Sequence, residues 1–305
     1  MFDVIIVGSG PAGLSAAVYA RRAGLETMVL EKNFMGGGQI LTTAEVDNYL
    51  GLPGVGGMEL GMKFEEHAKK LGAGFTTGIV QEIRQENGCF AVKTQAECLE
   101  AKAVVIASGA SHALLSVPGE EELTGRGVSY CATCDGAFFK GKTVAVAGGG
   151  DVAVADAIYL AKLCKKVVLI HRRDKFRAAN SLQEQLKSLP NIEYRWDCVV
   201  TNIVGDQKVE QLVVRNLKED VDSTLEVDGI FIAVGIHPDT AFAEGLVEMD
   251  DAGYILAGED CVTTTSGIFV AGDARTKKLR QVITAVADGA NAIASVQEYL
   301  STISS

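Results

Sequence analysis

The 305-residue sequence predicts an α/β fold with two Rossmann-like dinucleotide-binding domains. Two segments, 4–32 and 144–172, align with each other without a gap. Each contains a short apolar strand, a glycine turn, a helix with apolar residues at helical spacing, and a second apolar strand. This order of elements is the βαβ unit that binds dinucleotides. The 34 glycines, 5 prolines and 48% apolar residues also suit buried parallel strands joined by tight turns.

The two glycine turns carry matching small residues. They are Gly8, Gly10 and Gly13 in the first segment and Gly148, Gly150 and Ala153 in the second. In each set, the first residue permits a tight turn, the second lets the backbone approach a pyrophosphate, and the third lets the helix pack close to the strand. The free N–H groups at the helix start then hold the phosphates. One such turn is common in proteins, but two in matched contexts predict two nucleotide sites.

The residue that ends the second strand differs between the two segments. Glu31 in the first segment is placed to accept hydrogen bonds from a ribose 2′-OH, as FAD or NAD would offer. The second segment has His171 there, followed by Arg172, Arg173 and Arg177. A basic cluster binds a 2′-phosphate through charge-assisted hydrogen bonds, whereas a carboxylate repels it. The alternative is a solvated helix start, but the cluster lies where a 2′-phosphate site is expected. The pair of sites is typical of a flavin-dependent NADPH oxidoreductase.

Cys131 and Cys134 form a CxxC motif within the segment YCATCDG. A zinc site needs four ligands, and the chain has neither a second CxxC nor a histidine at ligand spacing. We therefore expect no metal and favour a redox couple over zinc or a structural pair. A turn that enters a helix places both sulfurs on one side, and the helix start lowers the thiol pKa.

Composition excludes several classes of partner. The net charge of −11 argues against nucleic acid and anionic membranes. No apolar run approaches the roughly 18–20 residues that span a bilayer. The N-terminal segment lacks the basic region and cleavage site of a secretory signal, so we expect a cytoplasmic protein. The other five cysteines are scattered, and we expect them to be buried apolar residues rather than a disulfide framework.

The C-terminal part offers further flavin contacts. Residues 265–275 predict a strand that runs into a turn, and residues 280–300 predict a long Ala-rich helix. Asp273 in that turn could hold ribityl hydroxyls or could cap the turn. The amides of Gln281 and Val282 at the helix start could face a negatively charged reduced flavin.

The motifs GSGPAGLSAA, GGQ, CATCD, GGGD, HRRDKFRA and GDAR…RQVITAVADGA, in this order, resemble those of low-molecular-weight thioredoxin reductases. The resemblance covers essentially the whole chain. It implies an FAD-binding domain of residues 1–113 and 244–305, with an NADPH and redox-disulfide domain of residues 114–243 inserted in it. It also implies a homodimer that acts as an NADPH-dependent thioredoxin-disulfide reductase, in which hydride passes from NADPH to FAD and then reduces the CxxC disulfide.

The same resemblance assigns the site residues. Those implied for FAD are Gly8, Gly10, Pro11, Ala12, Gly13, Glu31, Gly38, Gln39, Thr43, Asn48, Ala107, Gly109, Asp273, Arg280, Gln281 and Val282. Those implied for NADPH are Gly148, Gly150, Asp151, Val152, His171, Arg172, Arg173 and Arg177. Cys134 would lie nearest the flavin, and Cys131 would attack the disulfide of thioredoxin. Asp135 would be the general acid, or alternatively a cap of the following turn.

Two positions depart from the family pattern. Val152 stands where a small hydroxyl residue is usual, and Ala155 stands where a carboxylate is usual. Val152 removes one possible hydrogen bond, worth about 0.5–1.5 kcal/mol, near the NADPH pyrophosphate. The alternative function is therefore a reductase of the same fold with a different electron donor, or one that acts on a thioredoxin-like or small-molecule disulfide.

The CxxC precedes Gly148 closely and so belongs to the NADPH domain. The nicotinamide and the disulfide must then reach one flavin from the same domain. We therefore expect this domain to rotate about segments 114–118 and 239–245 between the two half-reactions.

Overall fold

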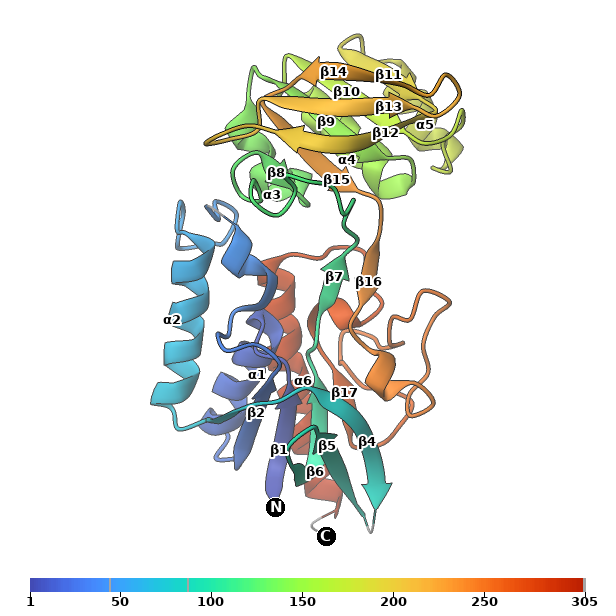
Figure 1. Cartoon of the computed structure of the whole chain (residues 1–305). Helices are drawn as coiled ribbons and strands as arrows, with labels where there is room; N and C mark the ends of the chain where they lie inside the picture. The colour runs from blue at the N-terminus through green and yellow to red at the C-terminus, as the bar shows by residue number, and fades with distance from the viewer. Residues whose placement is uncertain (44, 87, 304–305) are drawn as a thin grey trace. The chain divides into compact units, whose positions relative to one another are not determined.

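The computed structural model describes residues 1–43, 45–86 and 88–303, and the chain divides into two compact units (Figure 1). Unit 1 comprises Met1–Ser111 and His237–Ser305, and unit 2 comprises His112–Ile236. Unit 2 is thus an insertion within unit 1. The second boundary precedes the one expected at 243/244, because Ala243 is buried in the core of unit 1 with Val247 and Ile255. Residues 304–305, at the end of the expected segment 244–305, lie outside the described residues.

Unit 1 is built on a seven-stranded sheet with the order β3-β2-β1-β6-β5-β4, to which β17 adds beside β6. Its strands are β1 (Phe2–Val7), β2 (Thr27–Glu31), β3 (Gly74–Thr77), β4 (Val80–Glu86), β5 (Cys89–Thr94), β6 (Cys98–Ile106) and β17 (Ile268–Val270). The pairs β1–β2, β1–β6, β2–β3 and β6–β17 are parallel. The carboxyl ends of β1, β6 and β17 therefore meet at one edge, which is where ligands bind in such sheets.

Helices cover one face of this sheet. They are α1 (Pro11–Arg22), α2 (Gly57–Lys70) and α6 (Val282–Ile303). Unit 1 also has the 3₁₀ turns η1 (Gly38–Thr42), η3 (Ala241–Ala243) and η4 (Gly272–Ala274), of which η3 packs through Ala243 against the opposite face of the sheet. The buried side chains of α1 and α6 form one core with those of β1 and β6. A Cβ on Gly289 of α6 would lie 2.2 Å from the carbonyl oxygen of Ala12 in α1, so glycine permits this close contact. The contact keeps the start of α1 against α6.

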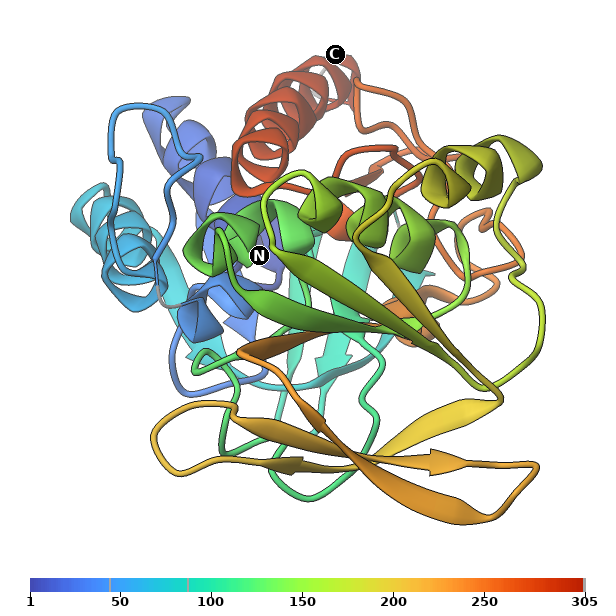
Figure 2. The same cartoon turned by 90° about the horizontal axis from the view of Figure 1, so that it is seen from above.

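Unit 2 contains a five-stranded parallel sheet with the order β11-β10-β9-β15-β8. Its strands are β8 (Val128–Ser129), β9 (Thr143–Gly148), β10 (Lys166–His171), β11 (Ile192–Trp196) and β15 (Gly229–Ala233). One face packs against α3 (Ala132–Asp135), η2 (Gly136–Phe139), α4 (Asp151–Ala161) and α5 (Asn180–Lys187). The other face packs against an antiparallel sheet of β12 (Cys198–Val204), β13 (Gln211–Asn216) and β14 (Val221–Glu226), as Figure 2 shows.

The chain passes between the units twice, along β7 (Ala110–His112) and β16 (Ile236–Pro238), which pair with each other. Backbone hydrogen bonds from Asp239 to Gly109 and from Ala113 to Gly235 continue this pairing at both ends. Each unit contains the βαβ order expected for a nucleotide-binding domain, so the predicted α/β fold is confirmed. Within the described residues, no helix has the length and apolar character needed to cross a membrane.

Candidate functional site

The first glycine turn joins β1 to α1. Gly8 has a φ of 103°, and a Cβ there would lie 2.4 Å from the carbonyl oxygen of Ala107. A Cβ on Gly13 would lie 1.9 Å from the carbonyl oxygen of Gly8. The packing of the protein itself therefore requires glycine at both positions.

Gly10 is different, because the protein leaves space beside it. Its backbone is extended, and a Cβ would meet only the Cα of Gly38, at 4.0 Å. It caps α1, which begins at Pro11 and has no acidic residue in its first turn. The N–H groups that follow, including that of Ala12, have no partner within the helix. A bound anion would use this space and these donors, so the turn fits the pyrophosphate of a dinucleotide.

Glu31 lies at the end of β2 and faces the same turn. Its carboxylate accepts hydrogen bonds from the Ser9 N–H at 2.9 Å, the Ser9 hydroxyl at 2.6 Å and the Asn33 N–H at 2.9 Å. These contacts fix the carboxylate, which stays partly exposed. Two carboxylate oxygens offer about four acceptor positions, so a ribose hydroxyl can still bind here.

Three buried side-chain polar atoms have no hydrogen-bond partner among the described residues. They are Ser108 Oγ, Asp273 Oδ1 and Arg280 Nε, all in unit 1. Ser108 and Asp273 follow β6 and β17, whose last residues pair in parallel. Buried polar atoms are nearly always hydrogen-bonded in folded proteins. A polar ligand at this strand edge would supply the partners, so these residues fit the flavin-bearing part of FAD.

The sequence predicted roles for Asp273 and Arg280 but missed Ser108. A hydroxyl residue directly after a buried strand is the signal that could have indicated it. Burial raises the pKa of Asp273, while the positive charges of Lys277 and Arg280 oppose this increase. Arg280 also lies over the ring of Tyr254, with its guanidinium carbon 4.2 Å from the ring centre. This stacking fixes the arginine beside the site.

The segment after Glu31 reaches the start of α6. Asn48 Nδ2 donates to Gln281 Oε1 at 2.8 Å. Val282, the first residue of α6, packs against Ile40, Val46, Val55 and Leu60. Asn48, Gln281 and Val282, three of the residues expected near the flavin, are thus brought together.

Three other expected FAD residues are held by hydrogen bonds within unit 1. The Gln39 side-chain amide donates to the carbonyl oxygen of Ala110, next to Gly109. Thr43 accepts a hydrogen bond from the Gly57 N–H. Ala107 is buried, and its N–H donates to Val7.

The second glycine turn, between β9 and α4, repeats the pattern of the first. A Cβ on Gly148 would lie 2.3 Å from the carbonyl oxygen of Ala233, whereas a Cβ on Gly150 would meet nothing within 4 Å. Asp151 accepts a hydrogen bond from the Ala179 N–H at 2.7 Å. Val152 follows it and is 53% exposed. The protein again leaves space at the middle glycine, which fits a second pyrophosphate.

The basic cluster after β10 separates into one buried and three exposed residues. His171 is buried against Gly149 and accepts from or donates to no arginine; its Nε2 lies 3.1 Å from the Lys175 carbonyl oxygen. Burial lowers the pKa of His171, and the charges of the neighbouring arginines lower it further. His171 therefore acts as a neutral support. The exposed residues are Arg172, Arg173 and Arg177, and no carboxylate among the described residues forms an ion pair with them.

Cys131 and Cys134 form a disulfide, with their Cα atoms 5.3 Å apart. Cys131 caps the short helix α3, and its Sγ accepts a hydrogen bond from the Cys134 N–H at 3.2 Å. The remaining five cysteines are free. Cys164, Cys198 and Cys261 are buried as expected, but Cys98 is exposed and Cys89 half-buried. The expectation was wrong for these two because both lie on the face of the β5–β6 pair that is less buried, at opposite ends of the pair.

Ser129, which the sequence analysis missed, connects the disulfide to Asp135. The Ser129 hydroxyl donates to Asp135 Oδ2 at 2.5 Å and accepts from the Cys131 N–H at 3.1 Å. Burial raises the pKa of Asp135, and the hydrogen bond from Ser129 opposes this increase. The carboxyl group is thus held beside the cysteines with a pKa raised by burial, which favours its protonated, proton-donating form.

Glu120 connects the disulfide segment to the point where the chain enters unit 2. Its buried carboxylate accepts hydrogen bonds from the backbone N–H groups of residues 115–117 and, at 3.0 Å, from the hydroxyl of Tyr130. Tyr130 directly precedes Cys131 and stacks on His112. The disulfide is therefore fixed to the segment that follows β7.

Comparisons with known proteins agree with this arrangement. A family model described as pyridine nucleotide-disulphide oxidoreductase matches residues 2–289. The thioredoxin reductase of Listeria monocytogenes serovar 1/2a is 43% identical over 301 residues, which cover 98% of this chain and 94% of that protein. The crystal structure of thioredoxin reductase from Streptococcus pyogenes MGAS5005 has 42% identity and a TM-score of 0.95, with 99% of both chains covered. The Lactococcus lactis thioredoxin reductase, crystallised in an FR conformation, has 40% identity and a TM-score of 0.68, with 99% of this chain and 100% of that chain covered.

We predict opposite effects of alanine at Gly10 and Gly13. Gly13→Ala should destabilise the fold by about 1–3 kcal/mol, because its Cβ overlaps the Gly8 carbonyl. Gly10→Ala should leave the apoprotein's unfolding temperature unchanged but weaken FAD binding by about tenfold or more, because its Cβ occupies the space left for the ligand. Thermal unfolding of the apoprotein measures the stability of each variant, and titration with FAD measures its affinity. Equal FAD affinity of Gly10→Ala and wild type would contradict the assignment.

Proposed function

The chain belongs to the pyridine nucleotide-disulphide oxidoreductase family, among its thioredoxin reductases, and on this premise we propose how its residues carry electrons from NADPH to the disulfide of thioredoxin. The family resemblance found in the sequence is thereby confirmed. The protein is a flavoprotein enzyme that uses FAD and NADPH. The proposal rests on the CxxC disulfide, which lies on the same unit as a nucleotide turn with three exposed arginines, while the other unit holds a second nucleotide turn.

Unit 1 would hold FAD. The α1 start and Gly10 would bind the pyrophosphate, Glu31 the ribose, and Asp273 with Ser108 the hydroxyl-rich chain next to the flavin ring. When bound, FAD accepts a hydride from NADPH and passes the electron pair to the disulfide of the chain. In unit 2, the Gly150 turn would bind the NADPH pyrophosphate, and Arg172, Arg173 and Arg177 would bind its 2′-phosphate. Val152 is exposed, so its replacement of a hydroxyl residue costs the fold nothing.

The reduced cysteine pair would then reduce thioredoxin by thiol–disulfide exchange. The Cys131 thiolate attacks one sulfur of the thioredoxin disulfide, and a mixed disulfide forms. The departing thioredoxin sulfur takes a proton from Asp135. Cys134 then attacks the Cys131 sulfur, which restores the Cys131–Cys134 disulfide and releases the second thioredoxin sulfur as a thiolate. The two electrons of the dithiol have passed to thioredoxin.

Unit 2 would rotate relative to unit 1 between the two half-reactions. Two features support this. Unit 2 carries both the disulfide and the NADPH turn, and β7 and β16 link it to unit 1. In addition, the two solved relatives above have similar identity to this chain and cover nearly all of it, yet their TM-scores differ widely, as expected if proteins of this family hold their two units in more than one orientation.

We also propose a homodimer in the cytoplasm, with thioredoxin as the protein partner. The names of the most similar relatives support the partner. The five free cysteines support a reducing compartment. A different electron donor is not favoured, because the arginines that would bind a 2′-phosphate are exposed and without ion pairs in the described part of the chain.

Anaerobic titration of the purified protein tests the electron path. NADPH should bleach the flavin absorbance, and oxidised thioredoxin should restore it. Cys131→Ser and Cys134→Ser should each lower the rate of thioredoxin reduction by more than about a thousandfold, because each removes one sulfur of the exchange. NADPH should still bleach the flavin of both variants. Cys98→Ser, at the exposed free cysteine, is the matched control and should react like wild type. A flavin that NADPH does not bleach would refute the donor, and bleaching without reoxidation would refute the acceptor.

Ser129→Ala tests the role of Asp135 as the proton donor. Loss of the Ser129 hydrogen bond should raise the pKa of Asp135 further, since this bond opposes the effect of burial. The protonated acid is the active form, so the alkaline limb of the pH profile of kcat/KM for oxidised thioredoxin should move to higher pH. Ser129→Thr keeps the hydroxyl and should retain the wild-type limb. If Ser129→Ala and wild type show the same pH profile of kcat/KM, Asp135 is not the proton donor.

A further inference from the structure

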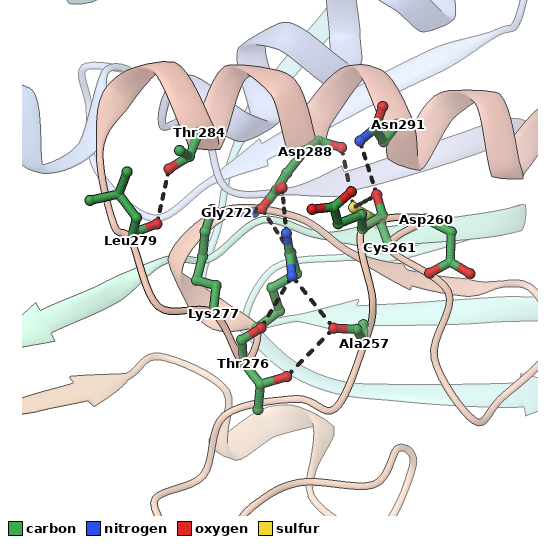
Figure 3. Close-up of polar contacts among 12 residues, drawn as sticks. Ala257, Asp260, Cys261, Gly272, Thr276, Lys277, Leu279, Thr284, Asp288 and Asn291 are labelled. Carbon is green, nitrogen blue, oxygen red and sulfur yellow. Dashed lines mark hydrogen bonds and ion pairs between the residues drawn. The ribbon is translucent and has the colours of Figure 1, made fainter.

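A buried carboxylate on α6 holds the turn that carries Asp273. Asp288 accepts hydrogen bonds from the Gly272 N–H at 2.9 Å, from Arg275 Nε at 2.9 Å and Nη2 at 2.7 Å, and from Lys277 Nζ at 2.8 Å (Figure 3). Gly272 directly precedes Asp273. The turn is therefore fixed to α6 by four hydrogen bonds to a single carboxylate. We call Arg275, Lys277 and Asp288 the Asp288 cluster.

The Asp288 cluster holds one more positive than negative charge. The side chains of Arg275, Lys277 and Asp288 are only 9%, 6% and 5% exposed. Burial by itself would raise the pKa of Asp288, but its hydrogen bonds from Arg275 and Lys277 outweigh this and lower the pKa. Asp288 is thus ionised and neutralises one of the two cations. A buried charge without a counter-charge lowers the stability of the fold. Stability alone therefore does not explain why a second cation is buried here.

The surroundings of the cluster do not supply the missing negative charge. The other titratable groups that face it are Cys261, Glu259, Asp260, Asp273 and Arg280. Burial raises the pKa of Cys261 to about 12, so this thiol is neutral. Glu259 and Asp260 are exposed. The carboxyl group of Asp273 interacts with Lys277, but the guanidinium of Arg280 lies beside it, so Asp273 and Arg280 together add no net negative charge.

The cluster lies directly behind the expected FAD site. A Cβ on Gly272 would lie 2.8 Å from the Cβ of Ala12, in the first turn of α1. The unpartnered Asp273 Oδ1 is one residue further along the same turn. The positive end of the α1 dipole and the excess cation therefore act on the same small region, where an anion would be favoured.

We propose that the Asp288 cluster preorganises the FAD site: Asp288 positions the Gly272–Asp273 turn, and Lys277 supplies a buried positive charge that favours the phosphate-bearing part of FAD. The inference rests on the proposed function, since it requires FAD in unit 1. It assigns a role to residues 275, 277 and 288, to which the sequence analysis gave none. Lys277 is the residue whose charge the fold does not need.

Lys277→Met tests the proposal, because it removes the excess charge and leaves the Arg275–Asp288 ion pair. Dilution of the purified holoprotein releases FAD, and the flavin fluorescence that appears gives the dissociation constant. We expect Lys277→Met to raise this constant by about tenfold and to reduce its dependence on salt. The apoprotein should unfold at the same or a higher temperature than wild type, because an uncompensated buried charge is gone.

Three further variants complete the test. Lys278→Met, at the exposed neighbouring lysine, is the matched control and should bind FAD like wild type. Lys277→Arg keeps the charge and should largely restore affinity. If Lys277→Met does not fold, Lys277→Gln, which is also uncharged but can hydrogen-bond to Asp288, replaces it.

Two results would overturn the inference. One is an unchanged dissociation constant for Lys277→Met; the other is weaker FAD binding together with a lower unfolding temperature of the apoprotein, which would make the cluster merely structural. In both cases the wild type still binds FAD. A wild-type protein that binds no FAD would instead refute the proposed function itself.

Discussion

Unit 2 carries both the Cys131–Cys134 disulfide and the nucleotide turn at Gly148–Gly150, and the chain joins it to unit 1 along β7 and β16. This constraint explains the contacts around the disulfide. Glu120 ties the segment that enters unit 2 to Tyr130, next to Cys131, so a movement of this segment carries the disulfide with it. Ser129 holds Asp135 beside the cysteines within the same unit. If unit 2 rotates as we propose, the redox centre would therefore move as one preassembled group, with Asp135 kept beside the cysteines.

The two nucleotide turns use the same physical solution. In each, the outer small residues are required by contacts within the protein, while Gly10 and Gly150 face space that the protein leaves open. The sites differ in charge. Unit 1 has Glu31 and the Asp288 cluster near its glycine turn, whereas unit 2 has exposed arginines near its own. This difference in charge supports the proposal that unit 2 binds a nucleotide with a 2′-phosphate and unit 1 a nucleotide with a free ribose hydroxyl.

Much of this site could be predicted from the sequence because its residues serve local backbone geometry. The glycine turns, Glu31 and the CxxC pair lie at fixed spacings from the strands and helices that present them. Ser108, Ser129 and the Asp288 cluster could not be found in this way. Their roles depend on which strand ends lie side by side and on contacts such as Asp288 with Gly272, across a turn and a long helix. The second domain boundary lies before the expected 243/244, because Ala243 already packs in the core of unit 1. The composition of the linker does not reveal this packing.

We propose that unit 2 serves the flavin alternately with NADPH and with its disulfide. The most direct measurement traps one orientation, with one cysteine introduced on each unit and joined by a maleimide crosslinker of fixed length while Cys131–Cys134 is oxidised. Stopped-flow absorbance then follows flavin reduction by NADPH and, separately, reoxidation of photoreduced flavin by thioredoxin disulfide. We expect turnover of the crosslinked protein to stop while one half-reaction keeps its normal rate. Both half-reactions running at wild-type rates in the crosslinked protein would contradict it.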